Sequence, residues 1–164
     1  MKKIIYSLLV LLAILFNFAS CSSDDSCDEF EASVTAEIAS AGTYSGTWYL
    51  TAVDPDNVET KSEAPGTLTF TATGVENVTS IRAYSEALDL DLTCDANITY
   101  AKDIYNFYFF NQVPTNAFES QFTGRILGDE NVEKATIAFS KVVSVRVGRK
   151  YYDYTYKYSF VGNK

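Results

Sequence analysis

The sequence predicts an all-β domain, an antiparallel barrel of about eight strands, from three observations. Apolar and polar residues alternate over most of the chain after residue 42, as in strands with one face in a core and one in water. Thr, Tyr, Val and Phe fill these runs and favour strands. Short turn sequences separate the runs, which favours an up-and-down barrel over the alternative, a β-sandwich with longer crossovers.

The expected strands and turns follow one another along the chain. The most regular alternating runs cover residues 43–52, 67–73, 88–94, 136–140 and 151–160. Turn chemistry predicts breaks at residues 54–57, 63–66, 95–97, 128–131 and 148–150. Residues 81–88 fit a short helix or an irregular link.

Three places depart from simple alternation. Residues 105–110 are apolar on both faces, which predicts burial on both sides or cover from a loop or a partner. Gly124 interrupts an alternating run and is a candidate bulge or corner. Lys141 has the same parity as the apolar residues Phe139 and Val143, so we expect a bulge near Lys141 that turns its side chain outward.

The first twenty residues are typical of a lipoprotein signal peptide. A basic start precedes an apolar run of about 13 residues, too short as a helix to span a hydrocarbon core of about 30 Å. Ala19-Ser20-Cys21 then resembles a lipobox. We expect residues 1–20 to be removed and acyl chains on Cys21 to hold the protein on a membrane. The alternative is an ordinary signal peptide with no role for Cys21.

An acidic tether, residues 21–37, is expected between this anchor and the globular domain, residues 38–164. Ser22–Asp25 resembles the export signal of surface lipoproteins in one Gram-negative phylum, which implies display on the outer face of the outer membrane; a solvated linker is the alternative. Cleavage would remove two of the 13 basic residues and none of the 21 acidic ones, and so change the net charge from −8 to −10. Since phosphate binding needs a basic surface, we expect no nucleic-acid partner.

The cysteines leave one question open. With Cys21 assigned to lipidation, Cys27 and Cys94 remain. A disulfide between them would close a long loop and contribute about 4 kcal/mol in the chain-entropy model. Cys94, however, continues the apolar alternation of residues 88–92, which directs its thiol into a core. Pairing and a free buried thiol both remain compatible with the sequence.

Short motifs at both ends of the domain resemble a known family. Residues 41–47 read Ala-Gly-Thr-Tyr-Ser-Gly-Thr, and residues 158–164 read Tyr-Ser-Phe-Val-Gly-Asn-Lys. They resemble the calycin-like β-barrel lipoproteins of gut bacteria, whose domains open G-x-Y-x-G-T and end in an aromatic strand followed by Gly and Lys. The resemblance covers the two ends of the domain. It implies a lipocalin-type barrel and no particular ligand.

The composition restricts the chemistry. The chain has no histidine, which excludes Ser-His-Asp and Cys-His catalysis and His-ligated zinc. Asp89, Asp91 and Asp95 gather near one strand end. On one strand face, Asp89 and Asp91 would lie about 7 Å apart and could bridge a calcium ion or act as paired catalytic carboxylates. We interpret them instead as the solvent face of a strand, and expect no enzyme activity, metal or cofactor.

Aromatic residues are the best candidates for ligand binding, because the chain has 12 Tyr, 11 Phe and one Trp. Alternation places Tyr152, Tyr154, Tyr156 and Tyr158 on one face of one strand. Since charge cannot face a dry core without a large penalty, this face points inward. We therefore expect low exposure for Tyr154 and Tyr156 and high exposure for the intervening Asp153 and Lys157. By analogy with lipocalin-like barrels, Trp48 is placed on the floor near the closed end.

The leading hypothesis is a surface-anchored, non-enzymatic binding module for a small apolar or glycan ligand. The ligand would contact Trp48, Tyr152, Tyr154 and Tyr156. One alternative is a structural, adhesion or complex-subunit lipoprotein with a filled core and no small ligand. A carboxylate-based hydrolase is the third hypothesis.

Overall fold

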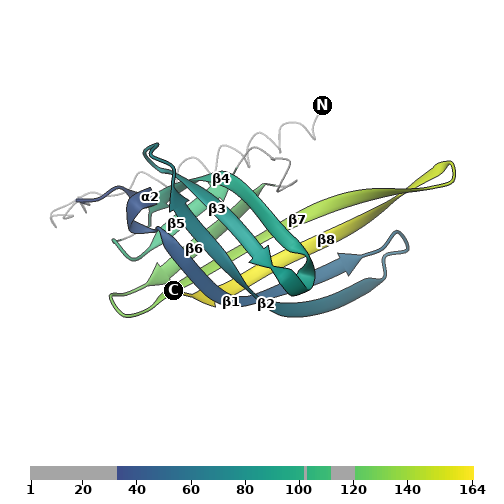
Figure 1. The fold of residues 1–164 in the computed structure, drawn as a ribbon, viewed down its shortest axis with the longest axis horizontal. Coiled ribbons are helices and arrows are strands. Elements are labelled where there is room, and N and C mark those ends of the chain that lie inside the picture. The colour runs from purple at the N-terminus through teal and green to yellow at the C-terminus, as the bar shows by residue number, and fades with distance from the viewer. Residues whose placement is uncertain (1–32, 102, 112–120) are drawn as a thin grey trace, which may run out of the picture.

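Eight antiparallel strands close into one barrel in the computed structural model, which describes residues 33–101, 103–111 and 121–164 (Figure 1). The strands are β1 (Gly42–Val53), β2 (Glu59–Ala72), β3 (Val78–Ser85), β4 (Leu90–Tyr100), β5 (Phe107–Asn111), β6 (Phe122–Gly128), β7 (Glu133–Val147) and β8 (Lys150–Asn163). Each strand pairs with the next, and β8 pairs with β1. The predicted eight-stranded barrel is therefore confirmed over the sandwich.

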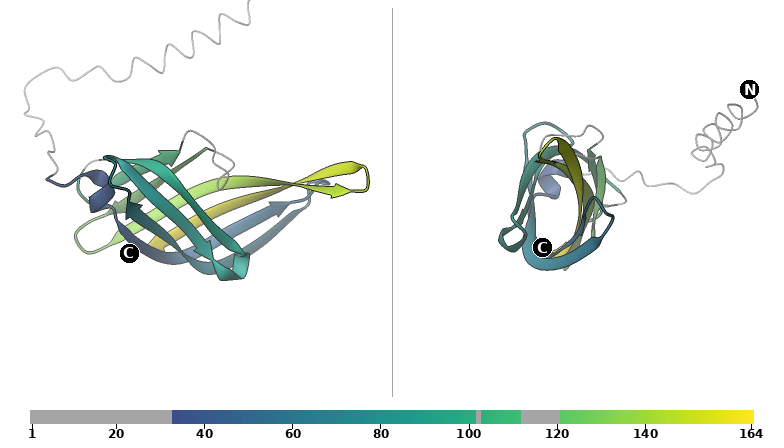
Figure 2. Two further views of the ribbon diagram at one scale, coloured as in Figure 1. Left: turned by 45° about the horizontal axis from the view of Figure 1, so that its top comes forward. Right: turned by 90° about the vertical axis from the view of Figure 1, so that its right-hand side faces the viewer.

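The barrel interior is filled by side chains. Burial alternates along the strands as the period of two predicts, and aromatic rings occupy much of the interior: Tyr44, Trp48, Phe70, Phe107, Phe109 and Phe160 are each at most 2% exposed. Phe70 packs edge to face with both Tyr44 and Phe109, with centroids 4.9 Å apart for Phe70 and Phe109, a favoured aromatic geometry. Seen along the long axis, the strands form a closed ring around this core (Figure 2).

Turn chemistry predicted three of the seven connections between the described strands, those after β1, β6 and β7. The Asp54 carboxylate accepts the N–H groups of Asp56 and Val58, and Asp129 organises the β6–β7 turn in the same way. Two predicted turns are wrong, because residues 63–66 lie in β2 and residues 95–97 in β4. Pro65 has no N–H group to donate to a sheet ladder. It is tolerated in β2 because β2 pairs there with β1 alone, and pairing with β3 starts only at Thr67.

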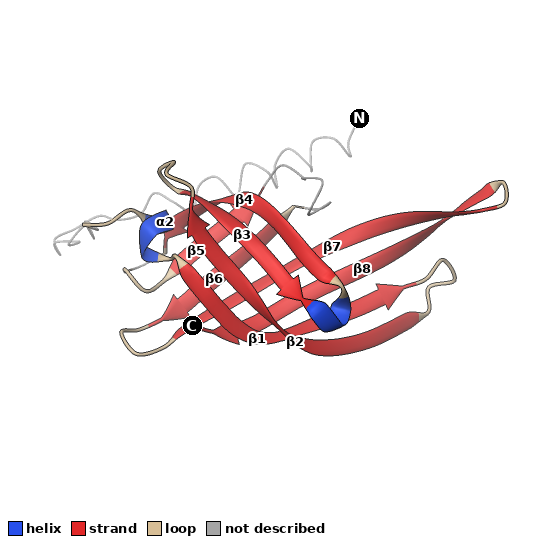
Figure 3. Cartoon of the chain, in the orientation of Figure 1, coloured by secondary structure: helices blue, strands red, loops and turns tan. Residues whose placement is uncertain are grey.

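One end of the barrel is closed by α2 (Ala36–Ala39), which packs on β2 and β4 (Figure 3). The buried Glu37 carboxylate accepts hydrogen bonds from the Thr35 hydroxyl at 2.6 Å and the Asn77 N–H at 2.9 Å. The Tyr100 hydroxyl donates to the carbonyl of Val34 at 2.6 Å. Residues 34–37, which the sequence places in the tether, therefore belong to the folded domain.

The motifs at the two ends of the domain meet where the barrel closes. Gly46 on β1 pairs with Gly162 on β8, and a Cβ on Gly46 would lie 2.4 Å from the Cα of Gly162. The Tyr44 hydroxyl donates to Glu133 at 2.6 Å, and the Lys164 ammonium lies 3.0 Å from the same carboxylate oxygen. The motif residues thus have a structural role in joining the first and last strands.

The predicted irregularities are mostly absent from the described strands. Pairing of β7 with β8 runs through Lys141 without a bulge, so the prediction that a bulge turns Lys141 outward is wrong. Gly124 also lies in regular register, opposite Phe109. On β5, Phe107 and Phe109 are buried while Tyr108 is exposed, with the Arg125 guanidinium 5.3 Å from the centroid of its ring. Residues 81–88 form the end of β3 followed by the 3-10 helix η1 (Glu86–Leu88).

At the end opposite α2, two hairpins extend past the other strands (Figure 1). We call this four-stranded extension, in the order β2-β1-β8-β7, the wing; it comprises residues 50–53, 59–64, 141–147 and 150–156. Among the described strands, β3 reaches β2 only from Thr67 onward, and β6 pairs with β7 only as far as Ala138. The inner face of the wing therefore continues the barrel wall beyond the barrel core.

Candidate functional site

The inner face of the wing carries the predicted tyrosines. Tyr152, Tyr154 and Tyr156 share the parity of the buried Phe160 on β8. Their partners on β7 are Val145, Val143 and Lys141, respectively. Leu50 and Ala52 of β1 continue the same face on the other side of β8. The structure thus brings three of the four predicted ligand-binding residues together on one sheet face.

Burial decreases along this face toward the tip of the β7–β8 hairpin. Phe160 is 1% exposed and Tyr152 is 37% exposed, while Tyr154, Tyr156 and Tyr158 between them are half-buried. Asp153 and Lys157 are exposed, which confirms the predicted register. The expected low exposure of Tyr154 and Tyr156 is only partly right, because they lie on the wing, beyond the pairing with β3 and β6.

Trp48 has the inner parity of this face but lies in the barrel core, before the wing begins. Its side chain is fully buried, with ring centroids 4.9 Å from Phe160 and 5.9 Å from Phe139. Its indole N–H donates to the carbonyl of Thr67 at 3.4 Å. Tyr44, nearer the start of β1, lies closer to the end that α2 closes. Trp48 is therefore a core residue on the same face, next to the wing, and the expectation that it lies near the closed end is wrong.

Tyr158 joins the core to the wing. Its ring stacks on Phe139 with centroids 5.1 Å apart. Burial, followed by the nearby Tyr156 and the charge of Asp89, raises the pKa of the Tyr158 hydroxyl above its ordinary value. The phenol is therefore neutral at physiological pH and available as a hydrogen-bond donor.

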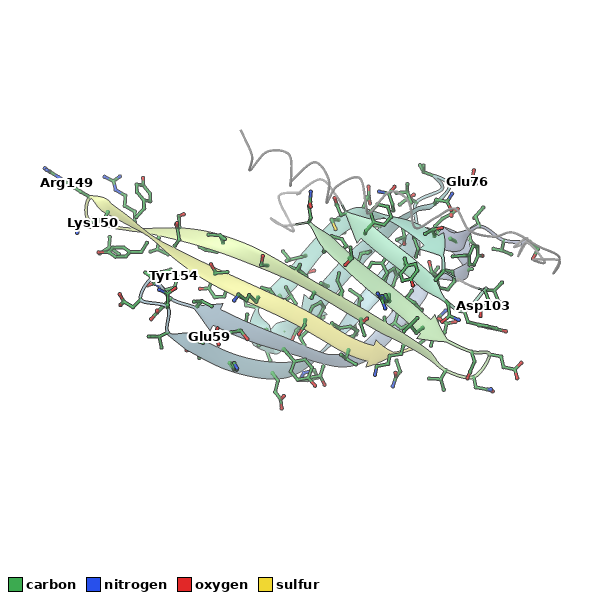
Figure 4. The ribbon with its side chains drawn as sticks, turned by 180° about the vertical axis from the view of Figure 1, so that it is seen from behind. Glu59, Glu76, Asp103, Arg149, Lys150 and Tyr154 are labelled. Atoms are coloured by element: carbon green, nitrogen blue, oxygen red, sulfur yellow. The ribbon has the colours of Figure 1, made fainter. Side chains whose placement is uncertain are left out.

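Charged residues divide between the two faces of the wing. Lys141 and Lys150 have inner parity, whereas the outer face carries both signs: Glu59, Glu63 and Asp153 together with Lys61 and Arg146. Figure 4 shows Arg149 and Lys150 at the end of the β7–β8 hairpin, with Tyr154 nearer the barrel and Glu59 on the β1–β2 hairpin. No described carboxylate lies within 4.0 Å of the charged groups of Lys141, Arg149 or Lys150.

Sequence reasoning missed the two lysines of the inner face. The parity of Lys141 was visible, but the expected bulge removed it from the face. Lys150 was assigned to a turn, although β8 begins with it and it pairs with Val147. Unbroken alternation through residues 141–147 was the signal that could have identified the first of these residues.

The acidic cluster does not form a site. Asp91 makes two hydrogen bonds of 2.8 Å with Arg82, and these lower the pKa of its carboxyl. Asp89 follows η1 in a left-handed conformation with a φ of 48°, so it does not share a strand face with Asp91. Within the described ranges, no group of three Cys, Asp or Glu residues is arranged to hold a metal ion. The expected pairing of Asp89 with Asp91 on one face is thus wrong.

Cys94 is a free, buried thiol. Burial raises its pKa to about 12, although a hydrogen bond with Asn111 acts in the opposite direction.

Cys21, Cys27, the signal peptide and the export signal lie outside the described residues. In the part of the chain that is described, no helix is long and apolar enough to cross a membrane.

Two hollows in the described surface lie away from Tyr152, Tyr154 and Tyr156. One of about 610 Å³ lies beside Tyr108, Phe110 and Arg125. Another of about 420 Å³ lies between Tyr49, Ser140 and Lys157. Tyr152, Tyr154 and Tyr156 line neither of these two hollows, and a third hollow, of about 310 Å³, lies on the wing beside Leu50 and Ser62.

Comparison of the chain with models of protein families, with curated proteins and with solved structures found no match.

Proposed function

We propose that the protein is a non-enzymatic surface lipoprotein of the outer membrane, anchored through Cys21, that binds a glycan on the inner face of the wing. The observation that carries this proposal is the row of Tyr152, Tyr154 and Tyr156 on one open sheet face. Tyrosine offers a flat apolar ring and a hydroxyl on the same side chain. Sugar rings present matching apolar faces and hydroxyl groups.

A glycan fits this face better than a small apolar ligand does. Sites for small apolar molecules are enclosed and bury most of the ligand surface. Here Trp48 and Phe160 are packed against one another in the core, and the wing rings lie on a sheet face where Tyr152 is 37% exposed and Tyr154 and Tyr156 are half-buried. An extended glycan can lie along such a surface with one side in water, so we prefer it among the two ligand classes.

The packed interior also supports a second candidate, a structural or adhesion lipoprotein without a small ligand. The described core consists of buried rings and aliphatic side chains throughout. The two candidates differ in what the wing tyrosines do. If the protein is a structural or adhesion lipoprotein, replacing the wing tyrosines changes its stability but does not change the binding of any sugar.

Affinity electrophoresis of the purified full chain through gels that contain defined polysaccharides tests the proposal. We expect at least one polysaccharide to retard the protein, and Tyr154→Ala and Tyr156→Ala to remove the retardation. Tyr49→Ala is the matched control, because Tyr49 is 45% exposed on the outer face of β1. Retardation that survives both wing substitutions would place glycan binding elsewhere and refute the proposed site, and no retardation in any gel would favour the structural candidate.

The anchor has its own test. Changing Cys21 to Ala should leave the protein soluble or unprocessed, because no thiol remains to accept the acyl chain. Fractionation of cells and the mass of the mature N-terminus measure this. A Cys21→Ala chain that still partitions with membranes and is cut at the same position would disprove the anchor.

A further inference from the structure

We propose that the glycan bound by the wing is anionic, a polysaccharide that carries carboxylate or sulfate groups; this rests on the proposed function and deepens it. The observation behind it is the position of Lys141 and Lys150 on the inner face, beside the three tyrosines. A neutral glycan could be bound by the three tyrosine rings without any charged group. The two ammonium groups add selection for negative charge.

The sign of the charge on each face follows from strand register. On the inner face, β1 contributes Leu50 and Ala52, and β2 contributes Thr60 and Ser62. Together with the inward residues of β7 and β8, they give a face with two lysines and no carboxylate. The carboxylates at this end of the described chain lie on the outer face of the wing or off the strands, in the β1–β2 turn and around η1: Glu59, Glu63, Asp153, Asp54, Asp56, Glu86 and Asp89.

Lys141 is the more informative of the two cations. Its side chain is half-buried, it pairs across the sheet with Tyr156, and no described carboxylate lies within 4.0 Å of its ammonium. A charge that is partly removed from water is stabilised by a partner of opposite sign. The whole chain has a net charge of −8, but residues 141–157 are locally basic, with Lys141, Arg146, Arg149, Lys150 and Lys157 against Asp153. An anionic polymer would therefore be attracted to this hairpin.

The spacing of the charges fits a polymer. Lys141 lies opposite Tyr156, and Lys150 starts the same strand. Six residues separate positions 150 and 156, which is about 20 Å along an extended strand. The rings of Tyr152, Tyr154 and Tyr156 lie between the two cations. A chain of several sugar units with acidic groups at intervals would contact a cation at each end and the rings between them.

An anionic bilayer is the rival occupant, because the tip of the hairpin is basic and partly apolar. Val147 is 62% exposed and Tyr151 is 68% exposed, next to Arg149 and Lys150. A flat bilayer would engage this tip and would leave the half-buried Lys141 without contact. The position of Lys141, back from the tip and among the tyrosines, therefore favours the glycan.

The test compares one neutral and two acidic polysaccharides, using the full chain in neutral detergent. Binding to immobilised dextran, dextran sulfate and polygalacturonate is measured by biolayer interferometry at low and high salt. We expect the protein to bind both acidic polymers at least about tenfold more tightly than dextran. High salt should weaken binding of the acidic polymers. Lys141→Gln should weaken acidic binding about tenfold, and Lys141→Arg should restore much of it.

Lys61→Gln is the matched control. It removes the same charge from the outer face of the wing, where the Lys61 side chain is 75% exposed. A loss for Lys61→Gln equal to that for Lys141→Gln would mean that net charge alone matters, and would overturn the proposal. Thermal melts of each variant verify that the wing substitutions leave the domain folded.

The remaining outcomes separate this inference from the proposed function. Equal binding of dextran and the acidic polymers, with loss in Tyr154→Ala, refutes the anionic ligand and keeps the glycan function. No binding of any polymer, or binding that Tyr154→Ala does not change, refutes both. Binding to vesicles of phosphatidylglycerol and phosphatidylcholine that Tyr151→Ala abolishes and Lys141→Gln leaves intact would assign the hairpin tip to a membrane and overturn the proposal.

Discussion

Gly124 on β6 gives the sharpest test of how the barrel is packed. A Cβ built at Gly124 would lie 2.1 Å from the Cζ and 2.2 Å from the Cε2 of Phe109, and 2.7 Å from the carbonyl oxygen of Thr136. Carbon atoms in favourable contact are about 3.5–4.0 Å apart, so the ring would have to move by about 1.5 Å. Phe109 is fully buried against Phe70, and a close-packed interior has no room for this movement.

Gly124→Ala should therefore destabilise the domain by about 2–3 kcal/mol, the upper part of the usual range for overpacking a core. For a domain of this size, that lowers the melting temperature by roughly 10 °C. Urea unfolding followed by the fluorescence of Trp48 measures the effect, because Trp48 is the single tryptophan of the chain and is fully buried.

A double-mutant cycle isolates the contact between the ring and the glycine. Phe109→Leu removes the ring atoms that the new methyl would meet, so Gly124→Ala should be less destabilising in the Phe109→Leu background by about 1 kcal/mol or more. Thr123→Ala, at an exposed position of the same strand, is the control and should change stability little. A Gly124→Ala chain within about 0.5 kcal/mol of wild type would refute the packing argument.

Three further predictions concern buried polar groups. Tyr44→Phe removes the hydrogen bond to Glu133 and should lower stability in urea by about 1–2 kcal/mol; no change would show that the contact does not help to close the barrel. Burial raises the pKa of Glu37, but hydrogen bonds, including those from Thr35 and Asn77, outweigh it and leave the pKa below the ordinary value of 4.5. Because a lowered folded-state pKa stabilises the fold above the unfolded-state pKa, Glu37→Gln should be destabilising near pH 7 and converge with wild type as the pH falls through and below 4.5, which urea titrations across pH would show. Cys94, with a pKa of about 12, should react with iodoacetamide at pH 8 far more slowly in the native protein than in urea, and fast native labelling would contradict its burial.

Local pattern determined most of the fold. Alternation is a property of neighbouring residues, so the facing of each strand could be derived without knowledge of its partners. Tyr152, Tyr154 and Tyr156 were correctly assigned to one face, with Asp153 and Lys157 on the other. Asp54, Asp129 and Gly148 marked turns by their own local chemistry. The signal peptide and the lipidated cysteine remain predictions from the same kind of local evidence.

Long-range pairing decided what the local pattern left open. Residues 63–66 and 95–97 resemble turns by composition, but the neighbouring strands supply partners that keep them extended. Lys141 stays on the inner face because the β7–β8 register continues through it. The half-burial of the wing tyrosines depends on where β3 and β6 stop, since burial is set by surrounding strands that are distant in sequence. The sequence alone therefore determined the faces of the strands, while tertiary structure decided how deeply each face is buried and which charges share it.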